Sequence, residues 1–229
     1  MLAIIKKLKE RNRLWSLVIF ALTTSICVAM VAFRIRYASN VTFVFLVWNI
    51  FLALIPYSIS TLLVLYHEQI KSKWLLVLPF VVWLSFFPNA PYILTDLFHL
   101  RQRPEAPFWY DLALILFFAW NGLMLGYASL IDIQHVISER FNHFIGWTVA
   151  IGSLILGSFG IYLGRYLRWN SWDVLSSPTG LFKDISDRVL NPMDHPQTYG
   201  VTIIFSVFLV VGYLLLVQIS SHRVLVPKK

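Results

Sequence analysis

Six long apolar runs, separated by mostly short polar connections, dominate the sequence. They cover residues of about 14–33, 41–66, 74–97, 110–131, 144–167 and 199–219. An α-helix needs roughly 20 predominantly apolar residues to cross the hydrocarbon core of a bilayer. The pattern therefore predicts an all-α, polytopic membrane protein with six transmembrane helices, forming a single integral membrane domain over 1–229.

The third apolar run is interrupted by two prolines. Pro88 and Pro91 free carbonyl groups in the preceding turn and prevent an unbroken helix. Such groups must be satisfied by protein or water in lipid, so a break at membrane depth usually lines a cavity or lies inside a bundle. Asn89 is placed to cap a new half-helix that starts near Pro91. We therefore predict a Pro-broken third helix.

Polar side chains follow the break and continue into the fourth run. Tyr92, Asp96 and His99 come at i, i+4 and i+7, which is one face of an α-helix. Asp111 opens the fourth run, where the free amides and dipole of a helix N-terminus favour a carboxylate. Asn121 lies about 15 Å deeper at the usual helical rise, which places it near the middle of the bilayer.

Small and amide residues predict where the spans contact one another. Gly122 and Gly126 are four residues apart, as are the small pairs Ser153–Gly157 and Gly160–Gly164 of the fifth run. Such spacing lets helix backbones approach closely, so we expect the fourth and fifth spans to cross in contact. Asn49, isolated in the second run, is expected to hydrogen-bond to another helix. The first run has no ionisable residue and is predicted to face lipid.

Basic residues gather at the outer end of the fifth run. Arg165 and Arg168 are one helical turn apart and are followed by Asn170 and Asp173. Two interpretations are open. The arginines could reach outward to lipid phosphates, or they could pair with the carboxylates of the third and fourth spans.

The last connection, 169–198, is the only long one. Ser177 and Pro178 suit the N-cap and first position of a helix of about 13 residues. One side of that helix is apolar, formed by Leu181, Phe182, Ile185 and Val189. An amphipathic helix of this kind is predicted to lie on the outer membrane surface between the fifth and sixth spans.

The charge distribution is typical of membrane orientation. The net charge is +8, but only 13% of the residues are charged, and the mean hydropathy is +0.70. The basic residues flank the spans, five before the first span and two after it, so nucleic-acid binding is excluded. The same bias predicts that both termini are cytoplasmic.

The polar residues at the outer ends of spans three to five form one candidate site. The catalytic candidates are Asp96, His99, Asp111 and Asp173. The substrate-binding candidates are Asn89, Tyr92, Asn121, Arg165, Arg168 and Asn170. Three of them, Asp96, His99 and Asp111, have the oxygen and nitrogen ligands that a divalent cation takes, although Asp-x-x-His alone is a weak pattern. Any other cofactor is unknown from the sequence.

Three blocks resemble a known family. FFPNAPYILTDLFHL (86–100), DLALILFFAWNG (111–122) and GSFGIYLGRYLRWNSWD (157–173) look like the signature blocks of a bacterial multi-pass membrane family catalogued as domain of unknown function 1361. The resemblance implies a bacterial cytoplasmic-membrane protein. It implies no activity and no catalytic residues.

Three functions fit these observations, and whether the protein is an enzyme stays open. The first is an outward-facing site that binds or processes a lipid or an anionic envelope precursor. The second is an accessory or assembly subunit whose polar network is purely structural. The third is a small-solute transporter, in which the polar lining would continue below Asn121 toward Asp132 and His135. The lipid bilayer is the one partner expected in each case, and the oligomeric state is unknown from the sequence.

Overall fold

The computed structural model describes residues 2–11, 13–70 and 72–222, which form helices and no extended strand. Contacts divide the chain into two compact units, Met1–Trp147 and Thr148–Lys229. The single domain expected over 1–229 stays a prediction.

The helices of the first unit are α1 (Leu2–Glu10), α2 (Leu14–Ala38), α3 (Val44–Tyr66), η1 (His67–Gln69), η2 (Lys73–Leu76), α4 (Val77–Phe86), α5 (Asn89–Tyr92), η3 (Ile93–His99) and α6 (Phe108–Arg140). Helix α7 (His143–Tyr166) begins in the first unit, and the second unit continues with α8 (Asp173–Ser176), α9 (Pro178–Leu190), η4 (Pro192–Asp194) and α10 (Pro196–His222).

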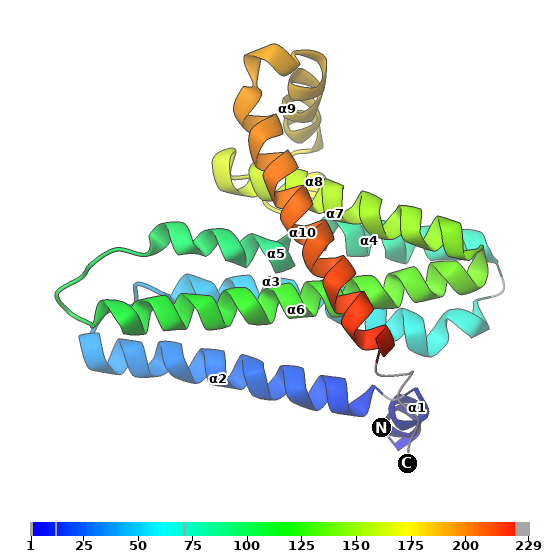
Figure 1. Ribbon diagram of the computed structural model, residues 1–229, viewed down its shortest axis with the longest axis horizontal. Coiled ribbons are helices and arrows are strands. Elements are labelled where there is room, and N and C mark those ends of the chain that lie inside the picture. Colours follow the sequence, from blue (N-terminus) through cyan, green and yellow to red (C-terminus); the bar gives the residue numbers. More distant parts are fainter. Residues whose placement is uncertain (1, 12, 71, 223–229) are drawn as a thin grey trace. The chain divides into compact units, whose positions relative to one another are not determined.

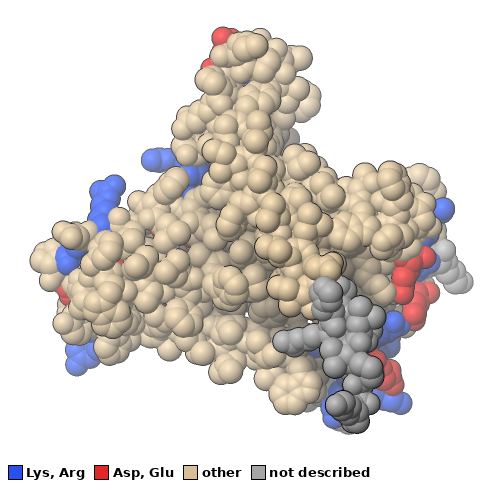
Figure 2. Space-filling view, in the orientation of Figure 1, with Lys and Arg blue, Asp and Glu red and all other residues tan. Residues whose placement is uncertain are grey.

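Six helical stretches in the described residues are long and apolar enough to cross a membrane, so the predicted all-α, six-span architecture is confirmed. They are Leu14–Ala38, Val44–Gln69, Lys73–His99, Phe108–Arg140, His143–Tyr166 and Pro196–Ser220. The first and fourth continue past the predicted ends at 33 and 131, because the apolar runs stop at charged residues that the helices still include. Figure 2 shows the result: charged side chains gather at the ends of the long helices of the first unit, with other residues between.

Helices α3 and α6 form the centre of the first unit. They run side by side, with α2 on one flank and the segment from α4 to η3 on the other (Figure 1). Fully buried apolar side chains from four of these elements fill the space between them, among them Cys27, Leu46, Ala53, Ile93 and Phe118. This core packs the helices of the first unit against one another.

The predicted break in the third span is present, but Asn89 has a different role from the one expected. Helix α4 ends at Phe86, and α5 begins at Asn89 itself with Pro88 as its N-cap residue. The Asn89 side-chain amide donates a hydrogen bond to the Phe86 carbonyl oxygen at 2.9 Å. The prediction of a cap near Pro91 is therefore wrong. Asn89 satisfies a carbonyl at the end of the preceding helix, which the break has freed.

The segment after the break is a 3₁₀-helix over Ile93–His99 and not the α-helix expected. A 3₁₀-helix has about three residues per turn, so residues three apart lie in line. Asp96 and His99 therefore share a face, whereas Tyr92 belongs to α5, before this segment begins. The tighter winding brings the acidic and imidazole side chains together.

The glycine pair of α6 lies against the broken helix. A Cβ atom at Gly122 would be 2.7 Å from Ile93 Cδ1 and 2.8 Å from the Ala90 carbonyl oxygen. One at Gly126 would be 3.0 Å from Ala90 Cβ. The close approach predicted for this pair is present, but the partner is α5 and the start of η3, because the break presents the small Ala90 side chain to α6.

The second unit contains the amphipathic helix expected in the long connection. Helix α9 has 13 residues, with Ser177 at its N-cap and Pro178 at its first position. Trp169 Nε1 donates to Asp184 Oδ2 at 2.8 Å, and the Tyr199 hydroxyl donates to the Arg188 carbonyl oxygen at 2.8 Å. These bonds tie α9 to the chain before it and to α10. Its position on the membrane surface stays a prediction.

Candidate functional site

A buried ion pair joins α2 to the first turn of α6. Arg34 donates from Nε to Asp111 Oδ1 at 2.7 Å and from Nη2 to Asp111 Oδ2 at 3.3 Å. Both side chains are only 1% exposed. The remaining guanidinium nitrogen, Nη1, donates to Asn40 Oδ1 at 3.3 Å. A bidentate guanidinium–carboxylate pair satisfies both charges without water, which is what burial inside a span requires.

A second arginine lies beside this pair and is partly accessible. Arg103 Nη1 is 3.8 Å from Asp111 Oδ2, and the Arg103 side chain is 21% exposed. Its Nη2 donates to the His99 carbonyl oxygen at 3.2 Å. The guanidiniums of Arg34 and Arg103 both lie near the buried ring of Phe43, at 5.7 and 5.1 Å from its centroid. Two cations therefore share one carboxylate, and both lie near one aromatic ring.

An acidic and imidazole pair stands next to Arg103. Asn49 Nδ2 donates to Asp96 Oδ2 at 2.7 Å, so the interhelical hydrogen bond expected for Asn49 is confirmed. His99 Nδ1 is 3.9 Å from Asp96 Oδ1. The Asp96 carboxylate is buried at 1% exposure, whereas the His99 side chain is 44% exposed and packs with its ring 4.8 Å from that of Phe45. The buried carboxylate of Asp96 thus lies beside the accessible imidazole of His99.

The metal-ligand candidates do not form a metal centre. Within the described residues, no group of three or more His, Cys, Asp and Glu side chains is placed to hold a metal ion. Asp111 is engaged by Arg34 and Asp96 by Asn49. Because these carboxylates already have cationic or amide partners, the arrangement favours acid–base chemistry or anion binding over cation binding.

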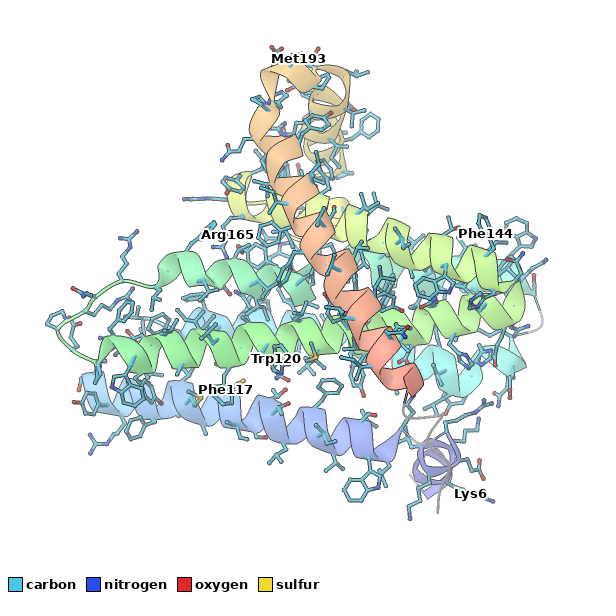
Figure 3. The ribbon with its side chains drawn as sticks, viewed as in Figure 1. Lys6, Phe117, Trp120, Phe144, Arg165 and Met193 are labelled. Carbon is cyan, nitrogen blue, oxygen red and sulfur yellow. The ribbon has the colours of Figure 1, made fainter. Side chains whose placement is uncertain are left out.

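Asn121 lies deeper in the first unit and is bonded to α2. It accepts a hydrogen bond from Thr23 Oγ1 at 2.8 Å and donates from Nδ2 to Thr24 Oγ1 at 3.0 Å. Its neighbour Trp120 is exposed and projects from the helix (Figure 3). The Asn121 amide joins two spans, and the depth of Asn121 in the bilayer stays a prediction.

Polar contacts are also present further along α6, after Asn121, but these side chains do not line an open path. Buried Asp132 accepts a hydrogen bond from Ser60 Oγ at 3.0 Å and is paired with Arg13. His135 is exposed and lies 3.2 Å from Glu139. Of the two residues that a transport path would use, Asp132 is therefore inside and paired, while His135 faces outward.

The remaining candidates lie in the second unit and are fixed by local turns. Arg165 is in the last turn of α7, whereas Arg168 has φ +62° and stands outside the helix. The Trp169 amide closes that turn on the Leu163 carbonyl oxygen at 3.1 Å. Because Arg168 occupies this left-handed position, the two arginines are not one helical turn apart as expected. Their pairing with the carboxylates of the first unit stays a prediction.

Asp173 and Asn170 form one turn. Asp173 accepts hydrogen bonds from the Asn170 amide at 2.7 Å and from Ser176 Oγ at 2.8 Å. These bonds hold the pKa of Asp173 below its ordinary value, with the backbone bond from Asn170 as the main cause. The carboxylate stays ionised and supports the start of α8, and its catalytic role stays a prediction.

Two residues of the site were missed in the sequence. Arg34 lies one residue beyond the predicted end of the first span, and Arg103 lies in a short polar loop. A signal for Arg34 did exist, since the predicted orientation places this basic residue on the outer side, where the positive-inside rule disfavours it. Its partner could not be chosen, because Asp111 is 77 positions away along the chain.

A known family covers most of the chain. The model of the family described as "Protein of unknown function (DUF1361)" matches residues 48–211, which includes parts of both units. Comparison with curated proteins and with solved structures finds no match. The match contains all three sequence blocks that resemble the family, at 86–100, 111–122 and 157–173. Since it extends over well more than half of the 229 residues, the chain belongs to this membrane-protein family of unknown function.

Proposed function

We propose that this protein binds the anionic headgroup of a lipid or envelope precursor at the His99 end of its first unit and acts on it there. The observation that carries the proposal is the accessible imidazole of His99 beside buried Asp96, with the guanidinium of Arg103 bonded to the backbone carbonyl oxygen of His99. An acid–base group beside an anion-binding group is what processing of a phosphorylated or carboxylated substrate needs.

Each side chain has a distinct role in this proposal. His99 takes or gives the proton, because an imidazole changes charge near neutral pH. Asp96 stabilises the protonated imidazole, and their 3.9 Å separation shortens to a hydrogen bond when substrate binds. Asn49 holds Asp96 in place through its 2.7 Å hydrogen bond. Arg103 presents its guanidinium to the anionic group of the substrate, for which a planar fork of donors is well suited.

The buried pair of Arg34 and Asp111 positions Arg103. Asp111 lies 3.8 Å from Arg103 and is itself fixed by Arg34. Neither Arg34 nor Asp111 is accessible, so neither contacts substrate in this proposal. They hold the local charge balance and the orientation of the loop between η3 and α6.

We infer a location in the bacterial cytoplasmic membrane with both termini in the cytoplasm, which opens the site to the outer leaflet. The five basic residues before the first span support this orientation. Reporter fusions test it: a cytoplasm-active reporter at the C-terminus and a periplasm-active reporter in the loop at Arg101 are both expected to be active. Activity of the periplasmic reporter at the C-terminus would reverse the orientation.

Lipid analysis of the purified protein tests the binding step. We expect an anionic polar lipid or precursor to co-purify with the wild-type protein and to fall about tenfold with Arg103→Gln, because a hydrogen-bonded charge pair contributes about 1.5–3 kcal/mol. Arg101→Gln is the matched control, since it removes an exposed arginine two residues away. An equal lipid content in both variants and the wild type would contradict the proposal.

A structural accessory role is the second candidate, and one observation favours it. Most of the buried charge in the first unit is already paired between helices, as in Arg34 with Asp111 and Arg13 with Asp132. Networks of this kind exist without chemistry. The two functions differ at His99, which an accessory role does not need in its acid–base form.

A further inference from the structure

A second site lies on the first unit, at the opposite end of α3 from Asn49. It is an apolar groove of about 520 Å³ between α3 and α4, lined from Ile59 to Tyr66 on α3 and from Leu78 to Val82 on α4. Both stretches belong to membrane spans, and Leu62 in the groove is exposed. The groove therefore opens toward the lipid phase and not toward the protein core.

The groove has the dimensions and lining of an acyl-chain site. Its α3 wall, Ile59–Tyr66, is about 10 Å long at the helical rise, roughly a third of the hydrocarbon thickness. Its lining carries almost no polar surface, since the tyrosine is the one residue there with a polar atom in its side chain. An apolar chain is the ligand that such a surface accepts without leaving polar groups unsatisfied.

A cation stands at one end of this groove. The Lys7 ammonium of α1 lies 4.1 Å from the centroid of the Tyr66 ring. Tyr66 is both the last residue of α3 and a wall of the groove. The nearby acid Glu68 is paired with Arg11 at 2.6 Å, so its charge is already offset. The groove is therefore apolar along its length and has the positive charge of Lys7 at its Tyr66 end.

We propose that an anionic glycerophospholipid occupies this site, with one acyl chain in the groove and its phosphate on Lys7. We infer this ligand from the two parts of the site. The apolar groove matches an acyl chain, and the ammonium of Lys7 matches an anionic headgroup. The site is separate from the one around His99, since Tyr66 and Asn49 are about 25 Å apart along α3. Its occupancy does not depend on the function proposed above.

Native mass spectrometry of the delipidated full-length protein tests this site. The probes are dioleoylphosphatidylglycerol, which is anionic, and dioleoylphosphatidylethanolamine, which has the same chains and no net charge. We expect the wild-type protein to prefer the anionic lipid. Lys7→Ala should lower the affinity for the anionic lipid about fivefold, the contribution of one basic residue at a membrane surface. It should lower the affinity for the other lipid less, because the ammonium of that headgroup already offsets its phosphate.

Lys6→Ala is the matched control for charge. Lys6 lies on the same helix as Lys7 (Figure 3). Its side chain is 80% exposed and pairs with Glu10. We expect it to have little effect on the affinity for either lipid. Equal affinity of the wild-type protein for the two lipids would overturn the proposal, and so would equal losses in Lys6→Ala and Lys7→Ala, which would mean a general basic surface.

Leu62→Trp tests the groove itself, by filling it with a larger side chain. We expect this substitution to lower the affinity for both lipids, since both have the same acyl chains. Leu22→Trp is its control, because Leu22 faces lipid on α2 with a similar exposure of 60%, against 56% for Leu62. If the two tryptophan variants bind both lipids equally well, the acyl chain does not lie in this groove.

Discussion

Arg34 and Asp111 pair in an antiparallel register that two other polar pairs also follow. Moving 10 residues back along α2 and 10 forward along α6 gives Thr24 with Asn121, and a further 11 gives Arg13 with Asp132. The outer two pairs are 21 residues apart on both helices, or about 31 Å. This is close to the hydrocarbon thickness, so we expect one ion pair near each edge of the apolar layer in a bilayer.

Breaking the Arg34–Asp111 pair should destabilise the first unit more than replacing it. Arg34→Leu leaves Asp111 buried beside the more distant Arg103, and we expect a loss of about 3–5 kcal/mol in the free energy of unfolding. The double variant Arg34→Leu with Asp111→Leu should recover most of that loss, because it buries no unpaired charge. Denaturation in mixed micelles measures both. A double variant as unstable as the sum of the two single variants would contradict the pairing.

The middle pair of the register should contribute less. Asn121→Leu is expected to cost about 1 kcal/mol, and its coupling to Thr24→Val should be about 0.6 kcal/mol, since interhelical hydrogen bonds in membranes are modest. A double-mutant cycle measures the coupling. Ser25→Ala is the control, because Ser25 bonds within its own helix to the Ala21 carbonyl oxygen. Coupling of Asn121 to Ser25 as large as to Thr24 would rule out this register.

A methyl group at Gly122 should disturb the broken helix. Gly122→Ala places its Cβ 2.8 Å from the Ala90 carbonyl oxygen, which is backbone and cannot move away cheaply. We expect a loss of about 1–3 kcal/mol and a displaced Asp96–His99 pair. Gly152→Ala is the control, since nothing lies within 4 Å of a Cβ there, and its higher helix propensity should make it neutral or stabilising. The order of thermal midpoints, with Gly122→Ala lowest, checks the prediction.

The turn after α9 should depend on pH through Asp187. Asn191 Nδ2 donates to one oxygen of Asp187 and His195 Nε2 lies 2.8 Å from the other. Both hydrogen bonds lower the pKa of Asp187, with that from Asn191 as the larger cause. A lowered carboxyl pKa adds stability above the unfolded pKa, and this stability is lost as pH falls through the folded pKa. NMR titration should show the lowered pKa in the wild type and a rise toward the ordinary value in Asn191→Ala.

The large features of the fold could be predicted because they follow from length and composition. Six apolar runs of this length are hard to accommodate in any structure other than membrane-spanning helices. Pro88 and Pro91 interrupt a helix whatever the conformation of the residues that follow. The same holds for α9, whose alternation of apolar and charged positions starts after Ser177 and Pro178. These inferences use neighbours in the sequence only.

Partners across the fold could not be predicted in the same way. One of the two interpretations paired the carboxylates of the third and fourth spans with Arg165 and Arg168. In the first unit Asp111 is bound by Arg34, and no local pattern favours one arginine over another. The partner expected for Gly122 was wrong, because spacing shows that a helix approaches but not which one. The 3₁₀ winding around Asp96 was missed for a related reason, since α and 3₁₀ helices have similar sequence preferences over seven residues.

The most direct test of the His99 site is complementation of a deletion strain with two variants of similar size. Asp96→Asn is isosteric and removes the carboxylate charge, and His99→Gln has a similar volume and removes the titratable imidazole. We predict that both reach the membrane in normal amounts and fail to restore the wild-type phenotype, whereas His135→Gln, at the other end of the first unit, restores it. Full complementation by Asp96→Asn and His99→Gln would contradict a role for this pair in proton transfer and would leave the structural function in its place.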